Sequence, residues 1–459
     1  MRIDECIQSL SMPLPEDIMK RKWAGDLEGA MAAIDIRLAG DLPQMLRDRL
    51  TVEKERIRRL PTQYPWQREE AIAKLRELVP DITDEEFDQL ELAGRIDFIY
   101  INGVKHYFVR FHRTLVKTIP AMMARTGNMP TPVSKWLDPM IAVIKDKGVM
   151  SRRITVEASI GLSEGRFVPG KYRVWLPFPA KSAQQSDIRL VDGNPDVIGD
   201  ENAFARSAYW EKDLTSEERT AIRYSYVSTI RYANPLHAAA PDAPLYPDAL
   251  PVEDADLSEE LPYIRFTPYL KSLAADLAGD ETDPIQKAWR FYCFATQKIT
   301  YSFVRDYFQI DDIGEYCALN SKGDCGLQAL LFIALCRISG IPARWQSGMS
   351  IDDDYVGAHD WAQFYVDGWG WLFCDPSYGG SAWRAKNTER HEFYFGNIDP
   401  MRMAANRRYQ APLTPAIGCF RVDPYDNQTG EMERVGAEIP FNGRDLDEDA
   451  CLIGFEELG

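Results

Sequence analysis

The chain has 459 residues, of which 45% are hydrophobic and 27% are charged, and this composition is that of a folded protein and not of a disordered or fibrous one. Its length is enough for two to four domains of ordinary size. Acidic residues (70) outnumber basic ones (53), and the formal charge of −17 disfavours nonspecific binding to nucleic acid or to anionic membrane surfaces.

Targeting signals and cofactor motifs are not evident. The start, MRIDECIQSLSMPLPEDIMKR, lacks the apolar core of a secretory signal, and no run approaches the roughly 18 apolar residues of a membrane span. We therefore expect a cytoplasmic protein with no membrane partner. The eight cysteines form no CxxC pair, which argues against a disulfide scaffold and a zinc site. The run Asp352-Asp353-Asp354 lacks the ligand spacing of a calcium loop, so we expect no metal and no cofactor.

Residues 1–148 are predicted to form a mainly helical N-terminal region. The stretch from Thr83 predicts a capped helix followed by a β-hairpin near 96–111, because Asn102-Gly103 favours the positive φ angles of a tight turn. A helix followed by a hairpin has some likeness to a winged helix. The flanking charge is mixed, however, and we expect no nucleic-acid partner.

Residues 149–233 show the alternation of apolar and polar residues that is typical of strands. Five such segments, separated by Gly, Pro, Asn and Asp, predict a small antiparallel β domain. The Pro- and Ala-rich residues 234–258 are predicted to be a linker. An α+β region is expected over 259–420, followed by a C-terminal extension over 421–459. The polar stretches 391–410 and 423–431 are predicted to be loops.

Cys325 lies where a helix is predicted to start. Asp324 is a candidate N-cap, and an apolar run follows until Gly340 and Pro342 end the helix. The first turn of a helix carries unpaired amides and the positive end of the helix dipole, which favour a thiolate, the nucleophilic form of cysteine. The commoner role of a single cysteine is a small buried core residue.

His359 and Asp375 lie at the two outer ends of a predicted β-hairpin. His359 opens the strand-like segment HDWAQFYV, the chain turns near Asp367-Gly368, and the return strand ends at Asp375. If the loop has an odd number of residues, both side chains lie on one face, directly opposite or one diagonal step apart. The carboxylate could then orient the imidazole. A histidine at a strand end and a strand-ending Asp-Pro turn are the alternatives.

Taken together, these segments resemble a known family. The run GDCGLQALLFIALCRISGIPARWQSG, then HDWAQFYV, then GWGWLFCDPSYG is similar to the core of the transglutaminase-like superfamily, whose fold is related to that of papain-type proteases. The resemblance covers roughly residues 285–380. It implies an α+β multidomain protein with a transglutaminase-like (papain-like) catalytic domain. It also implies roles for Cys325 as nucleophile, His359 as base and then acid, and Asp375 as the orienting carboxylate.

Other candidate site residues are less specific. Tyr301 and Asn320, upstream of the nucleophile, are candidate oxyanion donors, although a core tyrosine and a turn asparagine are the alternatives. Trp361 could line an acyl groove, although aromatic residues on a strand face more often pack in the core. Arg402 and Asn406 could bind a substrate carboxylate, although a surface cluster is the default expectation.

The predicted function is cysteine-dependent acyl transfer through a thioester. Hydrolysis of a peptide or amide bond is favoured, because water is always present whereas crosslinking needs a bound amine and exclusion of water. A protein-glutamine transglutaminase or peptide cyclase is one alternative, and a binding scaffold on the same fold is another. The expected partner is a peptide or protein substrate, and the sequence does not indicate the oligomeric state.

Overall fold

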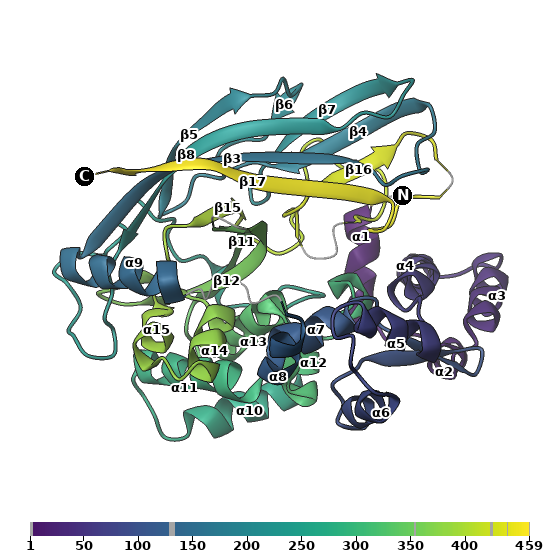
Figure 1. Ribbon diagram of the computed structural model, residues 1–459, viewed down its shortest axis with the longest axis horizontal. Coiled ribbons are helices and arrows are strands. Elements are labelled where there is room, and N and C mark those ends of the chain that lie inside the picture. Colours follow the sequence, from purple (N-terminus) through teal and green to yellow (C-terminus); the bar gives the residue numbers. More distant parts are fainter. Residues whose placement is uncertain (1–2, 128–133, 353–354, 423–425, 438, 459) are drawn as a thin grey trace. The chain divides into compact units, whose positions relative to one another are not determined.

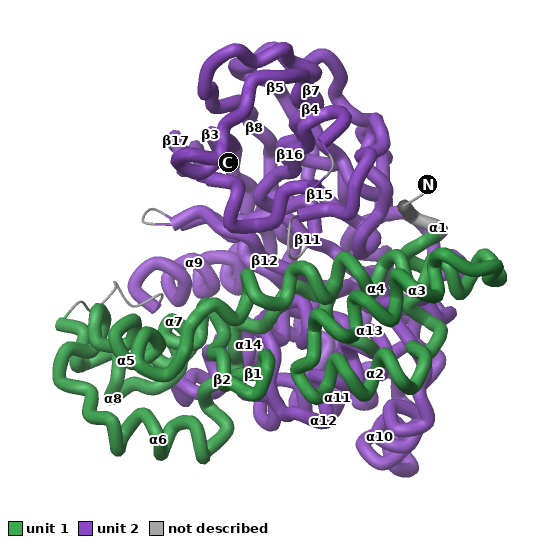
Figure 2. The backbone as a smooth tube through the Cα atoms, turned by 90° about the vertical axis from the view of Figure 1, so that its right-hand side faces the viewer, with its two compact units in different colours: residues 1–132, 301–311 green, residues 133–300, 312–459 purple. Residues whose placement is uncertain are grey.

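The computed structural model describes residues 3–127, 134–352, 355–422, 426–437 and 439–458, so Asp353, Asp354 and part of the predicted 423–431 loop lie outside the described residues. The chain divides into two compact units. One contains Met1–Pro132 and Tyr301–Asp311, and the other contains Val133–Thr300 and Asp312–Gly459 (Figure 2). No described helix has the length and apolar character needed to cross a bilayer.

The first unit is mainly helical, as the sequence predicts. At the start of α6, Thr83 Oγ1 accepts a bond from the Glu86 N–H (3.1 Å), and the Glu86 carboxylate accepts one from the Thr83 N–H (3.0 Å). The predicted hairpin is also present, with φ of 51° at Asn102 and 79° at Gly103. The elements of this unit are α1 (Ile3–Gln8), η1 (Ser9–Ser11), α2 (Glu16–Trp23), α3 (Leu27–Leu38), α4 (Gln44–Gln63), α5 (Arg68–Arg76), α6 (Asp84–Leu92), β1 (Phe98–Ile101), β2 (Val104–Tyr107), α7 (Phe111–Thr118), α8 (Pro120–Arg125) and η3 (Tyr307–Gln309).

The second unit contains two four-stranded antiparallel sheets, ordered β17-β3-β8-β5 and β16-β4-β7-β6. The five strands predicted over 149–233 are all present. Two more strands come from the C-terminal extension, for which the sequence predicts no structure, and β17 pairs along β3 from Leu446 to Leu458. The bounds are α9 (Ser134–Lys147), β3 (Val149–Leu162), β4 (Gly170–Pro177), β5 (Gln185–Asp192), β6 (Val197–Ile198), β7 (Ser207–Leu214), β8 (Thr220–Arg231), β16 (Glu431–Arg434) and β17 (Leu446–Leu458).

A five-stranded antiparallel sheet, ordered β14-β13-β12-β11-β15, carries the predicted hairpin. Within the second unit it lies between the other two sheets and a group of helices (Figure 1). Helix α13 packs on β12, where the Phe332 and Phe364 rings meet edge to face at 5.8 Å. The bounds are η2 (Asp254–Asp256), α10 (Pro268–Ala278), α11 (Pro284–Lys298), β9 (Thr300–Tyr301), α12 (Ile313–Asn320), β10 (Lys322–Gly323), α13 (Cys325–Ile338), β11 (Ala343–Ile351), β12 (Val356–Val366), β13 (Gly370–Cys374), α14 (Pro376–Arg384), α15 (Thr388–Phe393), β14 (Phe395–Gly396) and β15 (Arg402–Asn406).

Residues 402–406 correct one sequence prediction. The stretch 391–410 was expected to be a loop, but Arg402–Asn406 forms β15, and all five of its residues are buried. A strand buried on both faces has no alternation of apolar and polar residues, so RMAAN lacks the pattern that would predict a strand.

Candidate active site

Cys325 is the first residue of α13, as the sequence predicts. Asp324 caps the helix, and its carboxylate accepts a bond from the Leu327 N–H at 3.3 Å. Gly340, with φ of 77°, follows the end of the helix, where glycine tolerates the left-handed conformation. The thiol therefore lies in the first turn, where the helix supplies no acceptor for the backbone N–H groups.

The surroundings of the thiol do not favour a thiolate, contrary to the expectation from the helix dipole. The Cys325 Sγ donates to Asp360 Oδ2 at 3.2 Å, and Asp360 is buried. Burial raises the pKa of the Cys325 thiol well above its usual value, and Asp360 and Asp324 raise it further. Burial also raises the pKa of Asp360. The thiol is thus held in its neutral form, because two carboxyl groups and low polarity outweigh the helix terminus.

Gln428 fixes the Asp360 side chain from a distant part of the chain. Its Nε2 donates to Asp360 Oδ1 and to the His359 carbonyl oxygen at 2.9 Å. The thiol therefore lies against the residue that directly follows His359.

His359 and Asp375 form a buried pair. The His359 Nε2 lies 2.7 Å from Asp375 Oδ2. The register Ala362↔Cys374 and Val366↔Gly370 leaves a three-residue loop centred on Gly368, which puts the two side chains on one face, one diagonal step apart. The sequence predicts this arrangement. Burial lowers the pKa of His359, so the imidazole is held neutral.

Arg402 provides a charge next to this pair. Its Nη2 lies 3.1 Å from Asp375 Oδ2 and 2.7 Å from Asp399 Oδ2, and its guanidinium lies 4.1 Å from the centre of the Tyr378 ring. Burial alone would raise the pKa of Asp375, but His359 and Arg402 outweigh it and lower that pKa. Asp375 is therefore ionised and can hold a proton on His359 Nε2, which leaves Nδ1 as the basic nitrogen.

The structure brings only part of the predicted triad into direct contact. Neighbouring side chains of a strand point to opposite faces, so His359 and Asp360 leave β12 on opposite sides. Among the described residues, Sγ of Cys325 bonds to Asp360, and no hydrogen bond joins it to the His359 ring. Asp360 is the site residue that sequence reasoning missed. Its position directly after the candidate histidine was the available signal.

The other candidates lie as follows. Asn320 is exposed at the end of α12, where its Nδ2 donates to the Tyr316 carbonyl oxygen at 2.8 Å. Tyr301 belongs to the first unit, where Lys117 Nζ lies 4.1 Å from the centre of its ring.

Trp361, Arg402 and Asn406 are all buried, so the surface cluster expected for the two polar residues is wrong. Trp361 Nε1 donates to Gln346 at 2.7 Å, and Asn406 Nδ2 donates to Ser347 at 2.9 Å. In the part of the chain that the structure describes, no group of three or more His, Cys, Asp or Glu side chains is arranged to hold a metal ion.

Replacing Asp360 with asparagine should move the pH profile of Cys325 alkylation to lower pH, because the carboxyl contributes to the raised pKa of the thiol. The rate of reaction with iodoacetamide, followed by mass spectrometry of the Cys325 peptide over a series of pH values, measures this change. Asp367→Asn, at the exposed tip of the same hairpin, is the control. An unchanged profile, or a shift to higher pH, would show that Asp360 does not disfavour the thiolate.

Comparison with known proteins agrees with the sequence resemblance. Residues 271–376 match the model of the transglutaminase-like superfamily. No curated protein matches the chain. Among solved structures, a candidate cysteine protease from Cytophaga hutchinsonii is 13% identical, with 67% of this chain and 91% of that chain covered and a TM-score of 0.41. The periplasmic domain of TgpA from Pseudomonas aeruginosa is 16% identical, with 55% and 96% covered and a TM-score of 0.28. These low scores carry no information about the reaction.

Proposed function

We propose that this chain, whose residues 271–376 match the model of the transglutaminase-like superfamily, is a cysteine-dependent enzyme that hydrolyses a peptide or amide bond, with Cys325 as nucleophile. The observation that carries this proposal is the buried His359–Asp375 pair on the strand that contacts the Cys325 thiol. A structural cysteine does not need an ionised carboxylate and an oriented imidazole on the strand that it contacts.

In the proposed reaction the Cys325 side chain leaves Asp360 and moves to the side of β12 from which His359 projects, where the thiol bonds to Nδ1 of His359. His359 takes the proton, the thiolate attacks the carbonyl carbon, and a tetrahedral intermediate forms. His359 then protonates the departing amine and the C–N bond breaks, which leaves a thioester on Cys325. Water, deprotonated by His359, attacks the thioester and releases the acid and the thiol.

The charge on the intermediate's oxygen needs hydrogen-bond donors. The N–H of Cys325 is one candidate, because the first turn of α13 gives it no acceptor within the helix. Asp375 and Arg402 act on the other side of the imidazole. Asp375 keeps the proton on Nε2 and stabilises the positive charge that His359 carries after it has taken the thiol proton. Arg402 acts on Asp375, whose carboxylate it keeps ionised.

An electrophilic thiol probe tests the nucleophile. It should label the wild-type protein at Cys325, and labelling at that peptide should be absent in Cys325→Ala. Cys451→Ala is the matched control, because Cys451 is the exposed cysteine on β17. A folded wild-type protein that is labelled only at Cys451 would contradict the proposal and would favour a binding scaffold.

A set of peptide and amide substrates, each assayed with and without a labelled primary amine, then distinguishes hydrolysis from transfer. Hydrolysis releases the amine product and incorporates no label. Incorporation of the label together with ammonia release would instead indicate a transglutaminase.

A further inference from the structure

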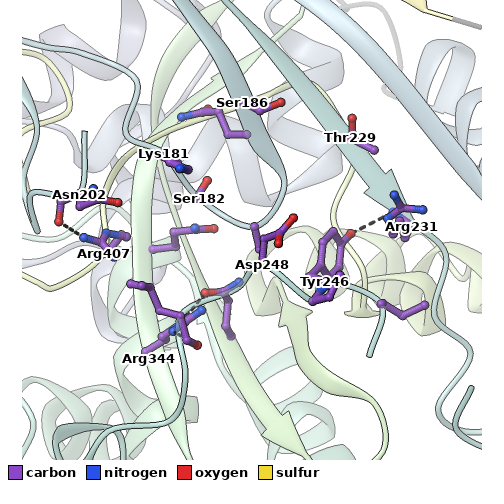
Figure 3. Close-up of a pocket in the computed structure, with 17 residues that line it drawn as sticks. Lys181, Ser182, Ser186, Asn202, Thr229, Arg231, Tyr246, Asp248, Arg344 and Arg407 are labelled. Carbon is purple, nitrogen blue, oxygen red and sulfur yellow. Dashed lines mark hydrogen bonds between the residues drawn. The ribbon is translucent and has the colours of Figure 1, made fainter. Parts of the chain in front are cut away.

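A polar cavity lies in the same unit as the candidate active site. It has a volume of about 300 Å³, and its walls come from the loop before β5, the end of β8, the irregular residues 245–250, and strands β11 and β12 (Figure 3). The Gln184 side chain, in the loop before β5, joins two of these parts, because its Nε2 donates to Oε1 of Gln346 on β11 at 2.8 Å. The cavity is therefore built from parts that are held together.

The lining of this cavity is strongly basic in a chain whose net charge is −17. Lys181, Arg231, Arg344 and Arg407 line it, against one carboxylate, Asp248. Such a concentration of positive charge in an acidic protein attracts anions.

Two of these arginines, Arg344 and Arg407, are held by neutral groups. Arg344 Nε donates to Gln363 Oε1 at 2.8 Å, and its guanidinium lies 3.7 Å from the centre of the Trp371 ring. Arg407 Nη2 donates to the carbonyl oxygens of Asn202 and Ala203. Among the described residues neither arginine forms an ion pair with a carboxylate. Burial lowers the pKa of Arg344 to about 10; Asp256 and Glu253 raise it in part, and the neighbouring Arg407 lowers it. An anion bonded to both arginines would compensate their burial directly.

Three buried polar atoms on the wall lack a hydrogen-bond partner in the described structure. They are Ser182 Oγ, Gln363 Nε2 and Arg407 Nε. Leaving a buried donor unpaired costs roughly 1–3 kcal/mol, so three in one cavity are unusual without a ligand to satisfy them. Gln363 Nε2 and Arg407 Nε can only donate, and the hydroxyl can do so, which matches an acceptor-rich ligand.

We propose that this cavity binds a small oxyanion ligand, a molecule that presents carboxylate or phosphate oxygens to Arg344, Arg407, Gln363 and Ser182. The site is distinct from the thiol site. The two sites are nevertheless connected by a short series of contacts. Gln346 lines the cavity and accepts a hydrogen bond from Trp361 Nε1, and the Trp361 ring lies 6.1 Å from the His359 ring. The oxygens could belong to a free small anion or to the C-terminal carboxylate of a peptide.

Isothermal titration calorimetry on the full chain distinguishes these two sources. The probes are inorganic phosphate, citrate, and the dipeptide acetyl-Ala-Ala as its acid and as its C-terminal amide. Binding of phosphate or citrate identifies a free-anion site, and binding of the peptide acid but not its amide identifies a peptide-carboxylate site. Either result supports the proposal. A dissociation constant above about 10 mM would mean very weak binding, so if no probe binds at concentrations up to that value, the proposal is wrong.

Two variants and a control locate the binding. Arg344→Gln should weaken it about tenfold or more, because it removes a charge-assisted donor. Ser182→Ala should weaken binding several-fold. The midpoint of thermal unfolding should be equal or higher, because the substitution removes a hydroxyl that has no hydrogen-bond partner in the free protein. Arg219→Gln, next to the opposite end of β8, should bind as the wild type does. Equal affinity in Ser182→Ala and the wild type, or equal weakening by Arg219→Gln and Arg344→Gln, would overturn the assignment.

Discussion

Replacing Asp375 with asparagine should lower kcat for amide hydrolysis by about 10⁴-fold, the effect expected when the carboxylate that orients a catalytic histidine becomes an amide. Both carboxylate oxygens of Asp375 accept hydrogen bonds. Oδ2 is within reach of His359 Nε2 (2.7 Å) and Arg402 Nη2 (3.1 Å), and Oδ1 accepts from the Tyr378 N–H (2.9 Å). An asparagine amide nitrogen would therefore face a donor in either orientation.

The consequence for His359 is a change of tautomer. If the amide nitrogen faces Nε2, that nitrogen must accept, the ring proton moves to Nδ1, and the nitrogen that should take the thiol proton is occupied. If the amide is turned the other way, its nitrogen opposes the Tyr378 N–H and loosens the start of α14. In a cysteine–histidine site where no other donor contacts the orienting residue, asparagine could replace aspartate. Here the other donors that contact Asp375 prevent this replacement.

Steady-state kinetics with a substrate found for the wild type measures this effect, and the loss should fall on kcat more than on KM. Asp138→Asn is the matched control, because Asp138 also accepts from an arginine, Arg390, at 2.7 Å, and is not part of the proposed site. Retention of the circular dichroism spectrum and of Cys325 alkylation excludes misfolding. A kcat for Asp375→Asn within tenfold of the wild-type value would refute the orienting role.

The predictions that the structure confirms in this region rest on local chemistry. Asp324, Gly340 and Pro342 mark the two ends of α13 within one stretch of sequence, and this is enough to put Cys325 in the first turn. In the hairpin, the parity of one short loop decides whether His359 and Asp375 share a face. Neither feature needs information about distant parts of the chain.

The features that sequence analysis missed depend on long-range packing. The contact between Cys325 and Asp360 arises because α13 docks on β12, and Gln428, some seventy residues away in sequence, fixes the carboxyl. A helix-start rule predicts a thiolate, but the pKa of this thiol is set by burial and by carboxyl groups that the rule does not include. Strand β17 escaped prediction because its sequence, LDEDACLIGFEEL, is largely exposed and charged, as is common for edge strands.

Replacing Arg402 with methionine should destabilise the second unit by about 3–5 kcal/mol at neutral pH, the cost of leaving a buried charge without its partner. Arg402 is 1% exposed and lies between Asp375 and Asp399, which are equally buried. Methionine fills much of the same volume, so the loss of stability would come chiefly from two carboxylates left together in one site without water. Urea denaturation followed by tryptophan fluorescence measures the change in the free energy of unfolding.

The pH dependence of this loss separates a charge effect from a packing effect. In the wild type the pKa of Asp375 is lowered, so the stability it contributes is present above the unfolded-state pKa and is lost as pH falls. Without Arg402, burial and the nearby Asp399 carboxylate raise the folded-state pKa of Asp375, so the variant gains stability relative to the wild type as pH falls. The difference between the two proteins should therefore shrink in acid.

Arg390→Met is the control for this experiment. Arg390 is also buried, but its partner Asp138 keeps 35% of its side chain exposed, so water can solvate the carboxylate that remains. We expect this variant to lose about 1 kcal/mol, with little dependence on pH. If Arg402→Met and Arg390→Met lose the same free energy, or if the loss for Arg402→Met does not shrink in acid, Arg402 acts through packing. Its proposed role in keeping Asp375 ionised for His359 would then fail.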